Sequence, residues 1–91
     1  MAFLKGKRAL IIGLASNRSI AWGIAQSFAR EGAELAFTYQ NEKLRPRVEK
    51  MANELGSTMT FPLDVSSDKE INNLIKKIQD HWDGMEILVH S

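Results

Sequence analysis

The chain contains no cysteine among its 91 residues, so it has neither a disulfide framework nor a thiolate metal site. No apolar run approaches the roughly 20 residues of a membrane-spanning helix, and residues 1–7 lack the long apolar core of a secretory signal. Charge of neither sign is in excess, because 12 Lys and Arg face 11 Asp and Glu. We therefore expect no nucleic-acid partner and no membrane partner, and a cytoplasmic location fits the absence of cysteine.

The composition that remains is that of a small globular domain. Hydrophobic residues make up 44% of the chain and charged residues 25%, which is ordinary for a single soluble domain. Apolar runs alternate with helical patterns along the chain. The pattern predicts strands at 8–12, 34–39, 59–63 and 85–90, and helices at about 20–31, from 41 or shortly after to 55, and from 68 to near 84.

The helices carry recognisable faces and ends. Ile20, Ile24 and Phe28 fall on one face of the first helix, and Ala21, Ala25 and Ala29 lie beside them for close packing on a sheet. Ser67 and Glu70 match a capping box at the start of the third helix. The apolar stripe of that third helix is formed by Ile71, Leu74, Ile75, Ile78 and Trp82. All three helices are long enough to cross between parallel strands.

The order βαβαβαβ predicts an α/β fold, the first half of a Rossmann-type doubly wound parallel sheet with strand order 3-2-1-4. The strand at 85–90 would then have one edge open, and parallel strands need both faces and both edges covered. We therefore expect residues 1–91 to be the N-terminal part of a single dinucleotide-binding domain whose remainder lies outside them. Isolated, this segment is expected to be marginally stable, to aggregate through its last strand and to be inactive.

The loop after the first strand has the features of a phosphate site. Gly13 ends the strand, small residues follow, and Ser19 and Ile20 open the helix. A helix N-terminus offers unpaired N–H groups and a partial positive charge, and small side chains let phosphates approach. Gly13 as an ordinary turn glycine and Ser19 as only an N-cap are the alternative interpretations. The strict G-x-G-x-x-G fingerprint is absent.

The end of the second strand bears on the choice of cofactor. Gln40 stands where many NAD enzymes place an acidic residue on the adenosine ribose. Arg45 and Arg47 follow and are able to meet a 2′-phosphate, although a solvated helix face is the interpretation we favour for them. Residue chemistry alone therefore leaves the choice between NAD and NADP open.

The third and fourth strands end on further candidates. Asp64 and Val65 follow the third strand, where an adenine is expected, and a simple turn aspartate is the alternative. His90 and Ser91 end the fourth strand, beneath the expected nicotinamide ribose, and His90 is interpreted as a packed strand residue. Neither His90 nor the solvent-facing His81 has neighbours at ligand spacing, so we predict no metal site.

Four segments also carry a family resemblance: Gly13-x5-Ser19-Ile20-Ala21-x-Gly23-Ile24-Ala25, Glu31 to Asn41 ending in Tyr39-Gln40-Asn41, Asp64-Val65, and Val89-His90-Ser91. Over essentially its whole length the chain resembles the bacterial NADH-dependent enoyl-[acyl-carrier-protein] reductases, a branch of the short-chain dehydrogenase/reductase superfamily. The long glycine–serine loop and the Tyr39-Gln40-Asn41 strand end are specific to that branch.

The resemblance implies an oxidoreductase of fatty-acid biosynthesis. It implies reduction of the trans-2 double bond of an enoyl thioester on acyl carrier protein, with NADH as cofactor, by a cytoplasmic homotetramer. The family's catalytic tyrosine and lysine lie beyond Ser91, so no catalytic residue is assigned in this segment. By resemblance, the cofactor contacts are Gly13, Ser19 and Ile20 at the pyrophosphate, Gln40 near the adenosine, Asp64 and Val65 at the adenine, and Ser91 on the nicotinamide side.

Two other functions remain as alternatives at this point. One is a different short-chain dehydrogenase/reductase that acts on a ketone or alcohol, which the spacing of the catalytic tyrosine and lysine would distinguish. The other is a non-catalytic nucleotide-binding module. Cooperative folding and NADH binding by the 91 residues alone would support that second alternative.

Overall fold

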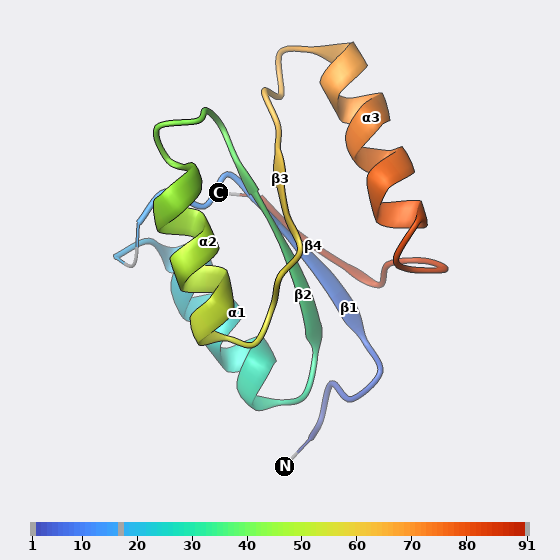
Figure 1. The fold of residues 1–91 in the computed structure, drawn as a ribbon. Coiled ribbons are helices and arrows are strands. Elements are labelled where there is room, and N and C mark those ends of the chain that lie inside the picture. Colours follow the sequence, from blue (N-terminus) through green and yellow to red (C-terminus); the bar gives the residue numbers. More distant parts are fainter. Residues whose placement is uncertain (1, 17, 91) are drawn as a thin grey trace.

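The computed structural model describes residues 2–16 and 18–90, and in this part strands and helices alternate as predicted (Figure 1). The elements are β1 (Arg8–Ile12), α1 (Ile20–Arg30), β2 (Glu34–Tyr39), α2 (Arg45–Glu54), β3 (Thr60–Pro62), α3 (Asp68–Gln79) and β4 (Ile87–His90). The strands form one parallel sheet in the order β3-β2-β1-β4. The predicted fold class and strand order are confirmed.

Helices cover both faces of the sheet, with α1 and α2 on one side and α3 on the other (Figure 1). Ile11 and Phe37 belong to the cluster under α1 and α2, whereas Leu10 and Ala36 belong to the cluster under α3. Successive residues of β1 and β2 thus enter opposite cores. This two-sided burial is why both strands are apolar without alternation, and why their predicted bounds are correct.

Helix α1 packs on the core through the alanines predicted for that contact, and Ala29 and Phe28 are partly buried against the same cluster. Its buried residues are Ala21, Trp22 and Ala25, while Ile20 is 85% exposed. The helix begins at the edge where the strands end (Figure 1). Ile20 therefore shares the apolar spacing of Ile24 and Phe28 but does not join the core.

The capping box of α3 is only half formed. Ser67 Oγ accepts a hydrogen bond from the Glu70 N–H at 3.3 Å, as predicted. The Glu70 carboxylate reaches further back, however, and its Oε1 accepts from the Asp64 N–H at 3.2 Å. Glu70 therefore ties the end of β3 to α3. On the apolar stripe of α3, Ile75 is 49% exposed, although Leu74 is buried.

Strands β3 and β4 are shorter than predicted, for different reasons. Pairing with β2 extends beyond β3, because Leu63 N–H donates to Tyr39 O at 2.9 Å, but only 60–62 are regular strand. Before β4, Glu86 Oε1 accepts from the Arg8 N–H at 2.8 Å. That bond lowers the pKa of Glu86, and regular strand begins only at Ile87.

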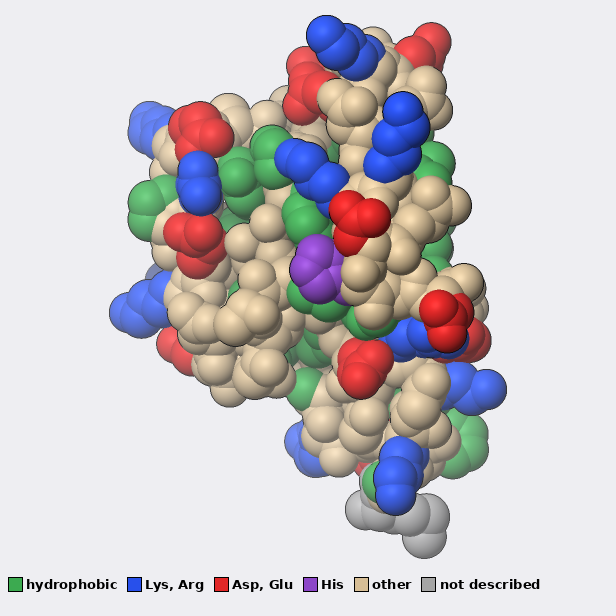
Figure 2. All heavy atoms as spheres, turned by 45° about the vertical axis from the view of Figure 1, so that its right-hand side comes forward, with side chains coloured by type: hydrophobic (Ala, Val, Ile, Leu, Met, Phe, Trp, Pro, Cys, Tyr) green, Lys and Arg blue, Asp and Glu red, His purple; other side chains and the backbone are tan. Residues whose placement is uncertain are grey.

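Charges of both signs are interspersed on the face drawn in Figure 2, in keeping with the formal net charge of +1. Hydrophobic atoms show between the charged side chains in the same view. In the described ranges, 2–16 and 18–90, no helix has the length and apolar character needed to cross a bilayer.

Candidate functional site

The carboxyl ends of β1, β2, β3 and β4 meet at one edge of the sheet, at the upper end of the view in Figure 1. A cleft of about 160 Å³ lies there. It is lined by Ile12, Gly13, Gln40, Leu63, Val65 and His90. Open α/β sheets bind ligands outside the carboxyl ends of their strands. The fold therefore brings Gly13, Gln40 and Val65, three of the predicted site residues, into one cleft.

Gly13 makes the turn out of β1 with a φ of 79°, in the left-handed region that favours glycine. Its N–H donates to Thr38 Oγ1 at 2.9 Å. Thr38 is 1% exposed and is the second-last residue of β2, so its hydroxyl fixes the turn from within the sheet. Sequence reasoning missed Thr38, and the available signal was a hydroxyl in an otherwise apolar strand.

Replacing Thr38 with valine is expected to lower the free energy of unfolding by about 1–3 kcal/mol, because the Gly13 N–H loses its acceptor while the side chain keeps its shape. Urea unfolding measures this. Thr58→Val is the matched control, since Thr58 is exposed. Equal stability changes in the two variants would show that the Thr38 hydroxyl does not hold the turn.

Ser19 is the N-cap of α1, as predicted. Its Oγ accepts from the Trp22 N–H at 3.2 Å and donates to Ser16 O at 3.0 Å. Ile20 is the next residue and the first of the helix, whose first N–H groups have no intrahelical carbonyl. Neither residue lines the 160 Å³ cleft; they lie at the helix end beyond Gly13. Their contact with a pyrophosphate remains a prediction.

Asp64 follows β3 beside the cleft and is held in a local turn. Its Oδ1 accepts from Ser66 Oγ at 2.6 Å and from the Ser66 N–H at 2.9 Å. These bonds stabilise the ionised form and lower the pKa of Asp64. The turn interpretation is thus correct for Oδ1, and an adenine contact through Asp64 remains a prediction. Its neighbour Val65 is 55% exposed and faces the cleft.

The Ser66→Ala variant is expected to raise the pKa of Asp64 toward its ordinary value, because the stronger cause of the lowering is lost. The lowered pKa of Asp64 stabilises the folded state at pH values above the ordinary carboxyl pKa. This contribution disappears as the pH falls through the lowered pKa. NMR titration of the Asp64 carboxyl carbon measures the shift. An unchanged pKa in Ser66→Ala would contradict the role given to Ser66.

His90, the last residue of β4, lies in a different environment from the one predicted. His90 was interpreted as a packed strand residue, but the structure exposes it and places it in the cleft. Val89 before it faces the α1–α2 core, so the alternation of β4 turns His90 to the other side. Ser91 lies outside the described residues. His81 is exposed, with Nδ1 3.0 Å from Lys77 O.

No group of three His, Asp or Glu side chains is placed to hold a metal ion within residues 2–16 and 18–90. A second cleft, of about 480 Å³, adjoins the loop after β1 on its α2 side. It is lined by Ser16, Arg18, Arg47, Lys50, Met51 and Glu54. This cleft is the larger, but no strand end reaches it, so the strand-end cleft is the candidate site.

The strand-end cleft fits one part of a dinucleotide. Whole ligand sites usually enclose about 300–1,000 Å³, and this cleft is smaller. Leu63 and Val65 offer apolar walls, Gln40 an amide, and Gly13 a close backbone approach. Such a lining suits an adenosine, with the N-terminus of α1 beyond Gly13 for the phosphates.

A family model and the curated relatives both match the chain to the same protein family. The family model described as "Enoyl-(Acyl carrier protein) reductase" matches residues 13–91. The chain is 54% identical over 91 residues to the enoyl-[acyl-carrier-protein] reductase [NADH] FabI of Haemophilus influenzae, and 55% identical to that of Neisseria meningitidis. These matches cover 100% of this chain and 35% of each relative. The chain thus spans about a third of the length of these curated relatives.

Solved structures agree. The enoyl-[acyl-carrier-protein] reductase (NADH) of Aquifex aeolicus matches with a TM-score of 0.94 and 52% identity, covering 97% of this chain and 38% of that chain. The reductase of Anaplasma phagocytophilum, crystallised in complex with NAD, matches with a TM-score of 0.90 and 37% identity. That match covers 94% of this chain and 33% of that chain.

Proposed function

The chain belongs to the enoyl-(acyl carrier protein) reductase family, and from this membership we propose that it is the NADH-binding part of such an enzyme. The reaction is reduction of the trans-2 double bond of an enoyl thioester on acyl carrier protein, in bacterial fatty-acid biosynthesis. The observation that carries the proposal is the cleft that joins Gly13, Gln40 and Val65 at the carboxyl edge of the sheet.

We propose the following roles for the chain's own residues, supported by the family resemblance and, for the described residues, by their places near the carboxyl edge of the sheet. Gly13 and the start of α1, with Ser19 and Ile20, hold the pyrophosphate through backbone N–H groups. Gln40 binds the adenosine ribose, while Val65 and Asp64 hold the adenine, and Ser91 contributes on the nicotinamide side. When bound, NADH supplies the hydride. The segment itself fixes the cofactor and orients it.

We propose further that residues 1–91 are the N-terminal part of a single dinucleotide-binding domain. The relatives are about three times as long as this chain, which supports the proposal. Exposed apolar side chains at β4 support the same proposal. Leu88 within the strand is 58% exposed, and Met85 just before it is 41% exposed. The catalytic tyrosine and lysine of the family then come from the remainder of the domain.

The family resemblance also leads us to propose a cytoplasmic homotetramer. Sedimentation equilibrium of the intact protein, meaning the natural polypeptide that contains residues 1–91, measures the assembly directly. A mass of four subunits is expected, and a stable monomer would contradict the tetramer.

The activity is tested by mixing the intact protein with NADH and an enoyl thioester and following the loss of NADH absorbance. Oxidation of NADH that depends on the enoyl thioester is expected, with the saturated thioester as product. Turnover of a ketone in place of the enoyl thioester would assign the chain to another short-chain reductase. Binding of NADH without turnover of either substrate would instead support a non-catalytic module.

A further inference from the structure

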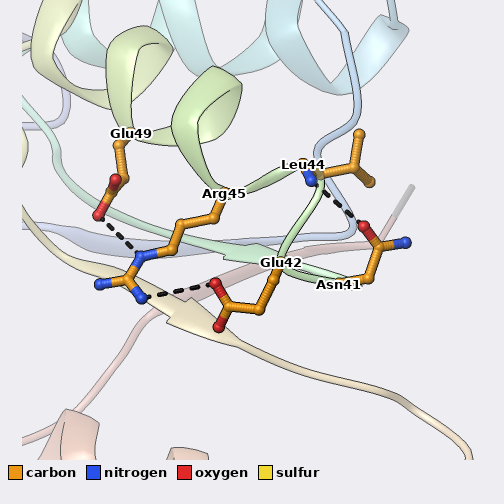
Figure 3. Close-up of polar contacts among 5 residues, drawn as sticks. All are labelled: Asn41, Glu42, Leu44, Arg45 and Glu49. Atoms are coloured by element: carbon orange, nitrogen blue, oxygen red, sulfur yellow. Dashed lines mark hydrogen bonds and ion pairs between the residues drawn. The ribbon is translucent and has the colours of Figure 1, made fainter.

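The turn between β2 and α2 holds an arginine between two carboxylates (Figure 3). Arg45 Nε donates to Glu49 Oε2 at 3.3 Å, and Arg45 Nη1 donates to Glu42 Oε2 at 3.5 Å. The turn itself is fixed by Asn41, whose Oδ1 accepts from the Leu44 N–H at 3.2 Å. In Figure 3 the guanidinium extends into the space between Glu42 and Glu49, whereas Asn41 points back to Leu44.

Helix stability does not explain this arrangement. Arg45 is the first residue of α2, at the positive end of the helix dipole, where a cation is unfavourable. The side chains of Glu42, Arg45 and Glu49 are 72%, 51% and 43% exposed. Exposed ion pairs contribute little to stability. The two ion pairs of Arg45 therefore add little to the stability of α2.

The three side chains stand in the turn after β2 and in the first two turns of α2. Their charges act on Tyr39, the last residue of β2: burial raises the pKa of Tyr39, Arg45 opposes that rise, and Glu42 and Glu49 add to it. Gln40 comes next in the chain and lines the cleft. In dinucleotide folds, this end of the second strand meets the ribose, and a nearby arginine accommodates the 2′-phosphate of NADP.

Arg45 begins the helix that follows this strand end, and its Nε and Nη1 donors are directed at carboxylates. Arg47, the other candidate, has its Nη1 at 3.4 Å from Ala15 O, on the side of the loop after β1. Lys43 adds a further positive charge in the same turn, so simple charge repulsion does not decide the choice. An arginine guanidinium is able to bind phosphate oxygens in a bidentate way when its donors are available.

We propose that Glu42 and Glu49 are specificity-determining residues, which hold the Arg45 guanidinium away from the ribose so that the site selects NADH over NADPH. This inference rests on the proposed function, because it assumes that the cleft binds a nicotinamide dinucleotide. It adds to that function the side chains responsible for cofactor choice.

The test measures dissociation constants for NADH and NADPH on the intact protein, by titration of the nucleotide fluorescence. The double variant Glu42→Ala/Glu49→Ala is expected to bind NADPH about tenfold more tightly than the wild type, because a released guanidinium gains a charge-assisted bond to the phosphate. NADH affinity is expected to change by no more than about twofold, since its ribose carries no 2′-phosphate.

Two further proteins make the test specific. Adding Arg45→Ala to the double variant is expected to return NADPH affinity to the wild-type value. Glu34→Ala is the matched control, since Glu34 is an exposed carboxylate at the amino end of β2, opposite the cleft. It is expected to leave both affinities unchanged.

The outcomes distinguish failure of the proposed function from failure of the role given to Glu42 and Glu49. Binding of neither nucleotide by the wild type overturns the proposed function. Tight NADH binding with unchanged discrimination in the double variant overturns only the role of Glu42 and Glu49. A gain in NADPH affinity that persists without Arg45 also overturns it, because repulsion by the carboxylates would then be sufficient.

Discussion

Replacing Gly13 with valine is expected to weaken NADH binding by about 10- to 100-fold, since a strained backbone of this kind costs about 1–3 kcal/mol. Gly13 adopts a φ of 79°, which a β-branched residue rarely tolerates. Valine would force the turn after β1 into another conformation and break the Gly13–Thr38 hydrogen bond. The loop would then carry Ser19 and Ile20 out of position for the phosphates. Fluorescence titration with NADH measures the loss.

Gly56→Val separates this effect from loss of folding. Gly56 has a φ of 80° and ends the turn after α2, with nothing within 4 Å of an added Cβ. It lies at the amino end of β3, opposite the cleft. The control therefore carries similar backbone strain, and NADH affinity should stay near the wild-type value. Similar losses of affinity in both variants would mean that Gly13 acts only through stability.

Truncation of Phe37 to alanine is expected to lower the free energy of unfolding by about 3–5 kcal/mol. Phe37 lies in β2, is 0% exposed, and is the largest fully buried side chain among the described residues. It packs in the cluster that joins the sheet to α1 and α2, so removing the ring leaves a cavity at the centre of that layer. Natural domains have about 5–15 kcal/mol of stability, so this is a large fraction.

Urea unfolding of the intact protein measures the change, and Phe3→Ala is the matched control. Phe3 is 79% exposed, so the same truncation there should change stability by less than about 0.5 kcal/mol. Equal effects at Phe3 and Phe37 would show that the layer under α1 and α2 is not the stabilising core.

Much of the fold was predictable because its strongest signals are local. β1 and β2 have their predicted bounds, since continuous apolar runs report burial on both faces. The faces of the helices were less predictable. Ile20 fits the apolar spacing of α1, yet its side chain is exposed. Its exposure depends on where α1 begins relative to the sheet, which the spacing of residues along the helix does not contain.

The candidate site was partly predictable for the same reason. Gly13, Gln40 and Val65 each follow a parallel strand, and parallel strands bring their carboxyl ends together. The contacts that hold these residues depend on register and turn geometry. The bond from Gly13 to Thr38 spans two strands, and the bonds of Asp64 with Ser66 and Glu70 compete with the contact predicted for it. The sequence offers only indirect signs of these bonds: a hydroxyl in the apolar second strand for Thr38, and the turn interpretation for Asp64.

A crystal structure of the intact protein with NADH tests the central claim most directly. The account predicts the pyrophosphate against the N-terminus of α1 at Ser19 and Ile20, the ribose at Gln40, and the adenine between Asp64 and Val65. NADH bound away from the carboxyl edge of the sheet, for example in the basic cleft beside Arg18 and Lys50, would contradict it.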